Sequence, residues 1–322
     1  MKNEAIGKKK SLKRKELMID LAPLIGLIIV VIVFAVLTEG KSISNVNLKI
    51  LTNQVILTAL VAIGLVFSFA CGALDMSSGG TLCLSAIAGA LAGIKTENFW
   101  IMILTVIAVS MGIAVFKGLV AAYLTLPIFI VMIIFGSFLT AIGLVLLGDE
   151  TTLSLGTIIP KMDMTLINVI FIGCFYLIAM IVFNYTKVGK ACKLQGGNFL
   201  AAGQSGINTK QNVIIAFVMS GIGITLAAII TILKTKTVTA STGGSIGNDV
   251  LVAIVLGGMP LSGGPRSKIS AALIGAATIT VLNNGLSICN VSNDIIQIVR
   301  GVIFIIVVFI TSASYRTKLL PR

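Results

Sequence analysis

The chain has 322 residues, of which 57% are hydrophobic and only 11% are charged, and its mean hydropathy is +1.09. A soluble domain has roughly 25% charged residues, so this chain has too few charges to cover a soluble globule of its size. The sequence contains no His, which excludes Ser-His-Asp chemistry and removes the usual zinc ligands. The composition therefore predicts an integral membrane protein.

The formal charge of +13 comes from bases that flank apolar segments. Seven of the 24 Lys and Arg residues lie in the first 15 residues, as expected for the cytoplasmic side of a membrane protein. We therefore expect a basic tail over residues 1–20 that meets the lipid bilayer, not nucleic acid. The same bias predicts that both termini are cytoplasmic, with a transmembrane domain over residues 21–314 and a short tail over residues 315–322.

Apolar segments long enough to cross a bilayer recur along the chain, since a spanning helix needs about 20 such residues. They predict an all-α polytopic helical bundle of about ten spans. The first follows basic residues as a signal peptide does, but its length favours an uncleaved span. The third and eighth are short and adjoin Gly-rich segments, which favours broken helices there. The expected spans are Leu21–Thr38, Leu51–Cys71, Thr81–Ile94, Phe99–Phe116, Ile128–Leu147, Leu166–Tyr185, Val213–Leu233, Val250–Leu261, Ile269–Ile288 and Ile295–Ser312.

Two Gly-rich segments, Gly72–Gly80 and Gly257–Pro265, resemble each other and both lie on the predicted inner side. They indicate either an internal duplication, as many transporters have, or a chance likeness between Gly- and Ser-rich turns. Asp75 and Ser77 in the first segment also have two interpretations. Either side chain can cap the following helix, and either can line a polar path through the membrane.

Arg300 lies within the last apolar span, where a charge is costly unless it has a partner or reaches water. It can extend to the outer interface, or pair with Asp294 or a backbone carbonyl. It can also form a polar lining together with Asn283, Asn284 and Gln297. Asp75, Ser77, Asn283, Asn284, Gln297 and Arg300 are therefore the candidate residues of a translocation path.

The sequence lacks the motifs of a membrane enzyme or an ATPase. A phosphate-binding loop needs the pattern GxxxxGK[ST], and the single GK[ST] match, at Gly40, has Ala35 in place of the first glycine. The five cysteines are scattered, without a CxxC pair. We expect no cofactor, metal site or disulfide in this chain, and any ATP that powers it to bind a separate subunit.

The longest inner segment, residues 186–212, contains a short predicted helix. Asn198 is a candidate N-cap, and Gly206 can end the helix. An ordinary linker is the alternative interpretation of this segment, but flexible linkers are more polar. Exposed apolar side chains at Phe199 and Leu200 favour a docking site for another protein.

These segments resemble motifs of ATP-binding-cassette importer permeases of the ribose and simple-sugar type, within the branched-chain amino acid permease superfamily. The resemblance covers nearly the whole chain in order. The segments that carry it read GALDMSSGG from Gly72, GKACKLQGGNFLAAGQSGIN from Gly189, NDVLVAIVLGGMPLSGG from Asn248 and VLNNGLSICNVSNDIIQIVRGVIFIIVV from Val281.

The resemblance implies a non-enzymatic permease in the cytoplasmic membrane of a prokaryote, importing a small polar solute, ribose or another simple sugar. It implies a second permease copy, identical or related, cytoplasmic ATPase subunits and an extracytoplasmic solute-binding protein. It also implies an ATPase-coupling segment comprising Gly196, Gly197, Asn198, Phe199, Leu200, Ala201, Ala202 and Gly206. Nucleosides or branched-chain amino acids are alternative solutes, and an ion-coupled secondary transporter is the alternative mechanism.

Several positions depart from the family pattern. Phe199, Leu200 and Gly203 replace charged residues of the coupling segment, so its surface is more apolar and a matched ATPase is expected. Lys117 stands where the family often has Asn, and it is expected among the inner, cytoplasmic bases.

Overall fold

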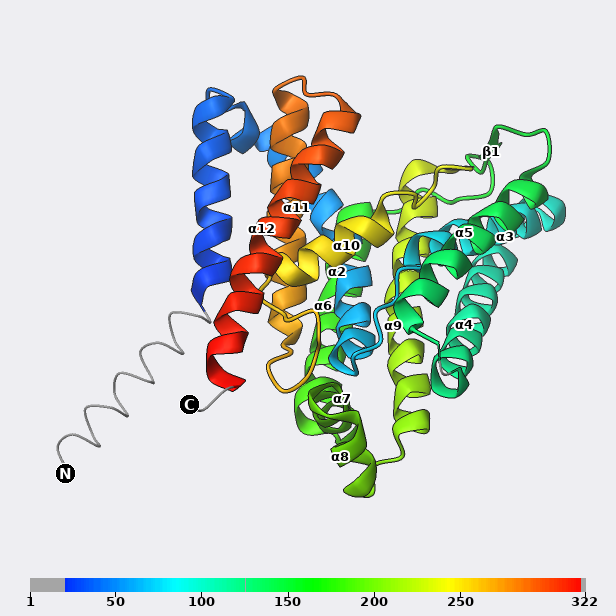
Figure 1. The fold of residues 1–322 in the computed structure, drawn as a ribbon. Helices are drawn as coiled ribbons and strands as arrows, with labels where there is room; N and C mark the ends of the chain where they lie inside the picture. The colour runs from blue at the N-terminus through cyan, green and yellow to red at the C-terminus, as the bar shows by residue number, and fades with distance from the viewer. Residues whose placement is uncertain (1–20, 125, 320–322) are drawn as a thin grey trace, which may run out of the picture.

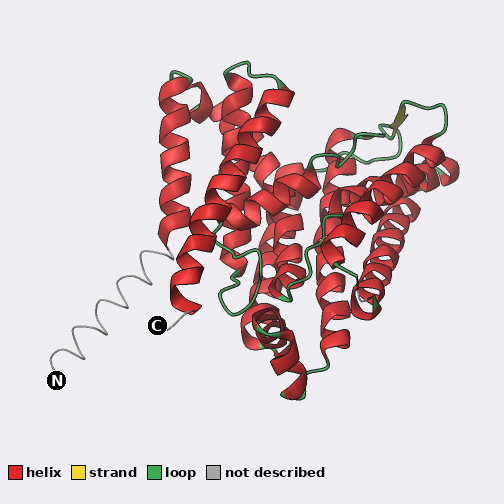
Figure 2. Ribbon diagram, viewed as in Figure 1, coloured by secondary structure: helices red, strands yellow, loops and turns green. Residues whose placement is uncertain are grey.

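The structure is a computed structural model that describes residues 21–124 and 126–319, so the predicted N-terminal tail and residues 320–322 lie outside the described part. The described chain is an all-α bundle with one small β-ribbon (Figures 1 and 2). It begins with the helix Leu21–Leu37 and a 3₁₀ turn, Lys41–Ile43. The remaining helices are α2 (Asn45–Ala70), α3 (Ser78–Thr96), α4 (Phe99–Tyr123), α5 (Ile128–Leu147), α6 (Met164–Tyr185), α7 (Lys187–Gly197), α8 (Phe199–Gln204), α9 (Thr209–Thr235), α10 (Ile246–Leu256), α11 (Ile269–Ile288) and α12 (Asn293–Leu319).

Seven helices among the described residues are long and apolar enough to cross a membrane: α2, α3, α4, α5, α6, α9 and α11. The helices Leu21–Leu37 and α10 are apolar but shorter. The polytopic membrane fold is therefore confirmed, whereas the expected count of about ten spans is not. The last helix continues past the expected end of its span, through to Leu319.

The spanning helices differ in how much of their surface is buried within the bundle, and they form a central group and a peripheral group. In α9, 72% of the most apolar window is buried, against 22% in α4, α5 and α6, although all four are strongly apolar. The large side chains exposed on the peripheral helices, such as Leu104, Ile134 and Leu166, suit a lipid environment, where apolar residues need no protein cover. Hydropathy alone does not separate the two groups.

Close backbone contact joins the central helices α2 and α9. A Cβ added to Gly64 of α2 would lie 2.9 Å from the carbonyl oxygen of Met219 in α9. Gly223 faces Gly64 across the same contact. Small residues let membrane helices approach closely enough for dispersion forces between backbones to stabilise the pair. This contact places α2 and α9 at the centre of the bundle (Figure 1).

Gly-rich connections adjoin α3 and α10, as the sequence predicts, but α3 is long enough to cross a membrane, so of these two helices only α10 is short. Residues 71–77 form an irregular segment between α2 and α3, and residues 257–268 form another between α10 and α11. The bounds differ from those expected, because α3 begins at Ser78 and α10 spans Ile246–Leu256, not Val250–Leu261. The second segment also contacts the end of α2, since the backbone N–H of Gly264 donates to the carbonyl of Ala70 at 3.0 Å.

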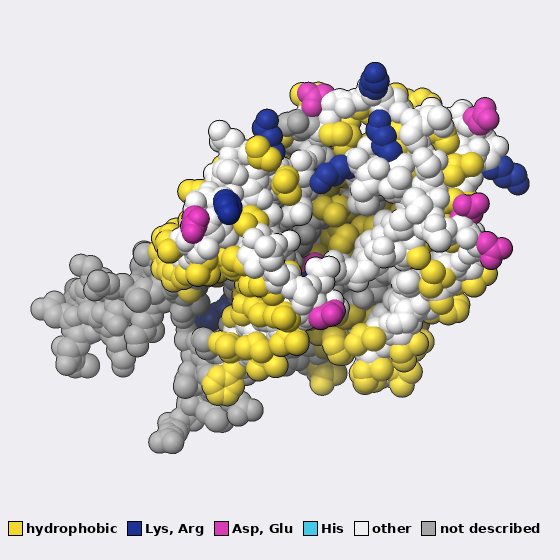
Figure 3. Space-filling view, turned by 90° about the horizontal axis from the view of Figure 1, so that it is seen from above, with side chains coloured by type: hydrophobic (Ala, Val, Ile, Leu, Met, Phe, Trp, Pro, Cys, Tyr) yellow, Lys and Arg dark blue, Asp and Glu magenta, His cyan; other side chains and the backbone are white. Residues whose placement is uncertain are grey.

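Two short strands join connections at one end of the bundle, here called the upper end. β1 (Thr152–Ser154) pairs antiparallel with β2 (Thr237–Thr239), with Leu153 opposite Val238. Seen from above, this end carries scattered Lys, Arg, Asp and Glu side chains, and hydrophobic side chains line the edge at the bottom of the view (Figure 3). Helices α7 and α8 lie at the opposite, lower end (Figure 1).

Candidate functional site

A polar cavity of about 480 Å³ lies between α2, α10, α11 and α12. It brings together four of the six candidate path residues, namely Asn283, Asn284, Gln297 and Arg300. The further lining residues are Gln54, Leu57, Thr58, Ser245, Ile246, Asp249, Thr280, Ser287, Asn293 and Ile296. We call this the upper cavity. Its amides and hydroxyls both donate and accept hydrogen bonds, which suits a neutral polar solute.

Neighbouring asparagines of α11 differ in their contacts. Asn284 forms a reciprocal amide pair with Asn47 of α2, with N–O distances of 2.8 and 3.0 Å. Asn283 Oδ1 is buried and has no hydrogen-bond partner among the described residues. Asn284 therefore joins two helices, whereas Asn283 has an acceptor available to a solute.

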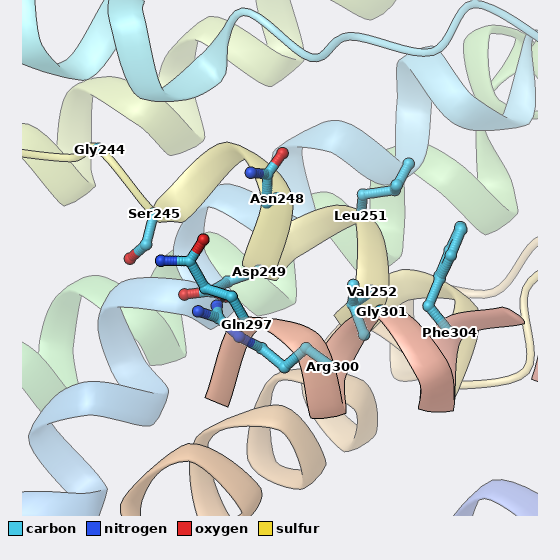
Figure 4. Close-up of a pocket in the computed structure, with 10 residues that line it drawn as sticks. All are labelled: Gly244, Ser245, Asn248, Asp249, Leu251, Val252, Gln297, Arg300, Gly301 and Phe304. Atoms are coloured by element: carbon cyan, nitrogen blue, oxygen red, sulfur yellow. Dashed lines mark hydrogen bonds and ion pairs between the residues drawn. The ribbon is translucent and has the colours of Figure 1, made fainter. Parts of the chain in front are cut away.

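Arg300 forms an ion pair with Asp249, the acidic residue in the first turn of α10. Both side chains are only 13% exposed. The suggested partner Asp294 is wrong, because α12 turns Arg300 toward α10. A second cavity of about 370 Å³, the lower cavity, shares Ser245, Asp249, Gln297 and Arg300 with the upper one and lies along α10 and α12 (Figure 4).

Asp75 and Ser77 do not line either cavity. Asp75 is buried, and its Oδ2 lies 2.7 Å from Lys117 Nζ in α4. Its Oδ1 accepts the backbone N–H of Ser77 at 2.9 Å and the Ser77 hydroxyl at 2.6 Å. The Ser77 side chain makes no capping hydrogen bond, so of the two candidate caps Ser77 is wrong, whereas Asp75 accepts the N–H of Ser77, the residue directly before α3.

Lys117 is likewise not an inner surface base. Its ammonium is fully buried and also donates to Thr81 Oγ1 of α3 at 3.2 Å. The Ser220 hydroxyl of α9 lies 3.5 Å from Asp75 Oδ2. The expected position was wrong because the apolar helix α4 extends to Tyr123, so Lys117 is enclosed within it. The pair ties the start of α3 to α4 and α9.

The inner segment contains two helices, α7 and α8, and the sequence predicted only the second. Asn198 caps α8, since its Oδ1 accepts the N–H of Ala201 at 3.0 Å. Gly206, with φ of +82°, follows the end of α8, and the N–H of Ile207 donates to the carbonyl of Ala202. This arrangement is a Schellman-type end. Leu200 is 76% exposed and Ala202 is buried, so α8 presents an apolar surface at the lower end.

The C-terminal end of α7 packs on the bundle through backbone contacts. Gly196 has no room for a Cβ, because the carbonyl oxygen of Ala70 and the backbone N of Gly264 occupy that space. Nearby, Asn212 Nδ2 donates to Gln195 Oε1 at 2.9 Å. Burial lowers the pKa of Lys193, whose ammonium lies 4.4 Å from the centre of the Phe183 ring. The end of α7 therefore contacts the end of α2 and the connection between α10 and α11.

Comparison with known families supports a transport role for this architecture. The model of the family described as branched-chain amino acid transport system / permease component matches residues 47–308. The chain belongs to this family. The permease therefore crosses the membrane many times and moves a solute through it. No solved structure matches this chain.

Curated relatives of the permease match it over nearly full length. It is 26% identical to the ribose import permease protein RbsC of Escherichia coli (strain K12), over 89% of this chain and 92% of that protein. It is 28% identical to RbsC of Bacillus subtilis (strain 168), over 90% and 92%. It is 26% identical to the xylose transport system permease protein XylH of Haemophilus influenzae, over 90% and 95%. These matches confirm the resemblance seen in the motifs.

Sequence reasoning missed Asp249, Gln54 and Thr280 of the permease as lining residues. Asp249 lies directly before the expected span Val250–Leu261 and was therefore not considered as part of it. These lining residues could have been found from the sequence as polar residues within an apolar helix or at its edge. Such residues are rare, and they face protein or water.

Proposed function

We propose that this chain is the membrane subunit of an ATP-driven importer of ribose or another simple sugar. The observation that carries the proposal is the upper cavity, where amides, hydroxyls and the Asp249–Arg300 ion pair lie beside a few apolar side chains. A sugar presents many hydroxyl groups and no charge, so such a lining can replace its hydration. The names of the relatives support the same solute class.

The power source is a separate ATPase that docks on α8 from the cytoplasm. The exposed Phe199 and Leu200 side chains supply an apolar contact, and the contact of Gly196 with Ala70 and Gly264 supplies the connection to the bundle. In this proposal the ATPase binds the ATP, and the permease supplies the path for the solute. Two permease copies, identical or related, and an extracytoplasmic solute-binding protein complete the importer, with both termini in the cytoplasm.

Uptake of [¹⁴C]ribose tests the proposal. Proteoliposomes should contain the permease with its partner ATPase, and should receive the binding protein on the outside and ATP within. We expect ribose accumulation that requires ATP and is competed by unlabelled sugars. Competition by leucine or a nucleoside alone would assign the permease to the alternative solutes. Accumulation driven by an ion gradient without the ATPase would overturn the mechanism.

A further inference from the structure

The upper and lower cavities follow one another along α12. The upper cavity is lined by α12 residues from Asn293 to Arg300, and the lower one by residues from Gln297 to Phe304. Because a helix rises about 1.5 Å per residue, the two occupy successive levels. The shared residues Ser245, Asp249, Gln297 and Arg300 stand at the boundary between them.

The Asp249–Arg300 ion pair lies at this boundary, and Figure 4 shows both side chains among those that line the lower cavity. Asp249 projects from α10 and Arg300 from α12, so the pair spans the gap between the two helices. Below it apolar side chains make up a larger share of the lining, with Leu251, Val252 and Phe304 among ten residues, against three among fourteen in the upper cavity. A solute that moves from the upper to the lower cavity therefore passes the pair.

The pair is suited to opening and closing. Both partners are mostly buried but belong to different helices, so a small separation of α10 and α12 breaks the contact. Arg300 Nε is buried and has no hydrogen-bond partner among the described residues. Each charged group can instead bond to sugar hydroxyls, since a guanidinium donates and a carboxylate accepts. The solute can thus replace the partner that each group loses.

We propose that Asp249 and Arg300 form a latch that separates the upper cavity from the lower one and parts as the solute passes. The proposal rests on the proposed function, because it assumes that the cavities are the solute path. It assigns Asp249 a role in transport, and it predicts that the latch restricts passage even when no solute or ATPase is present.

Thiol labelling tests the latch without any solute. Cys174 and Cys289, the exposed native cysteines among the described residues, are first replaced by Ser. Leu251→Cys then reports on the lower cavity and Ser287→Cys on the upper cavity. A membrane-impermeant maleimide is added to the external side of oriented proteoliposomes, and the labelling rates are measured.

With the native pair we expect rapid labelling at position 287 and slow labelling at position 251. Asp249→Asn and Arg300→Gln should each raise the rate at position 251 by about tenfold, as loss of about 1.4 kcal/mol of closing free energy would do. The charge-reversed double variant Asp249→Arg/Arg300→Asp should restore slow labelling. Asp294→Asn, an exposed acidic position on the same helix, should leave the rate unchanged.

Equal labelling rates at position 251 in the native, Asp249→Asn and Arg300→Gln proteins would overturn the latch. Gel filtration identifies any variant that fails to fold, and the other single variant then decides the result. Failure of the native complex to take up [¹⁴C]ribose would count against the proposed function instead. The two failures are distinguishable because labelling requires neither sugar nor ATP.

Discussion

Lys117 Nζ lies 2.7 Å from Asp75 Oδ2, and neither side chain is exposed. The pair joins the irregular segment before α3 to α4, in the interior of a membrane bundle. Burying two charges is expensive, and the Ser77 and Thr81 groups that hydrogen-bond to the pair offset part of that cost. An unpaired charge at this position has no such compensation.

Replacing Lys117 should therefore destabilise the permease strongly. Lys117→Met leaves the Asp75 carboxylate buried without its cation, at a cost of about 3–5 kcal/mol. Thermal denaturation in detergent should show a large fall in the midpoint. Asp75→Asn/Lys117→Met should recover much of the loss because it removes both charges, and Lys95→Met, at an exposed site, is the control. A double variant no more stable than Lys117→Met would contradict this explanation.

The exposed face of α8 should be needed for coupling but not for folding. Leu200→Asp and Ala201→Asp place charges on exposed positions, so the protein should insert normally and lose ATP-dependent uptake. Ala202→Asp should instead reduce the folded yield, because Ala202 is buried. Lys190→Gln, also exposed on the inner segment, serves as the control. Unchanged uptake in the Leu200→Asp/Ala201→Asp variant would exclude the docking role.

Gly196 and Gly203 offer a matched pair of substitutions in the inner segment. Gly196→Ala should displace α7 from Ala70 and Gly264 and reduce coupled transport, since no space exists for a Cβ. Gly203→Ala meets nothing within 4 Å and should stabilise α8 by about 0.5–1 kcal/mol. ATP hydrolysis and uptake, measured together in proteoliposomes, separate the two. Equal uptake by both variants would show that the close contact at Gly196 is not required.

Adjacent asparagines of α11 should give opposite phenotypes. Asn284→Ala leaves Asn47 without its side-chain amide partner and should cost about 1–3 kcal/mol of stability. Asn283→Ala removes an acceptor with no partner among the described residues, so stability should hold while the KM for uptake rises. Thermal denaturation and uptake kinetics check both variants. A stability loss at Asn283 as large as that at Asn284 would place it in the packing rather than in the path.

Much of the candidate site could be predicted from the sequence, but not its partners. The cluster of Asn283, Asn284, Gln297 and Arg300 was predicted because polar residues are rare in apolar helices. Asp249 was missed because its partner Arg300 lies 51 positions away in the sequence, and local patterns do not show such a contact. Lys117 was misplaced because a base near the end of an apolar run reads as a cytoplasmic flank.

The sequence by itself determined the environment of this protein, since its long apolar runs and scarce charges are compatible only with a membrane. It also determined the cap at Asn198 and the helix end at Gly206, because both depend on local backbone geometry. Only the tertiary structure decided which charges pair, which asparagine faces the cavity, and which helices lie inside the bundle. Those outcomes depend on contacts between residues far apart in the chain, and hydropathy does not distinguish a helix that faces lipid from one that faces protein.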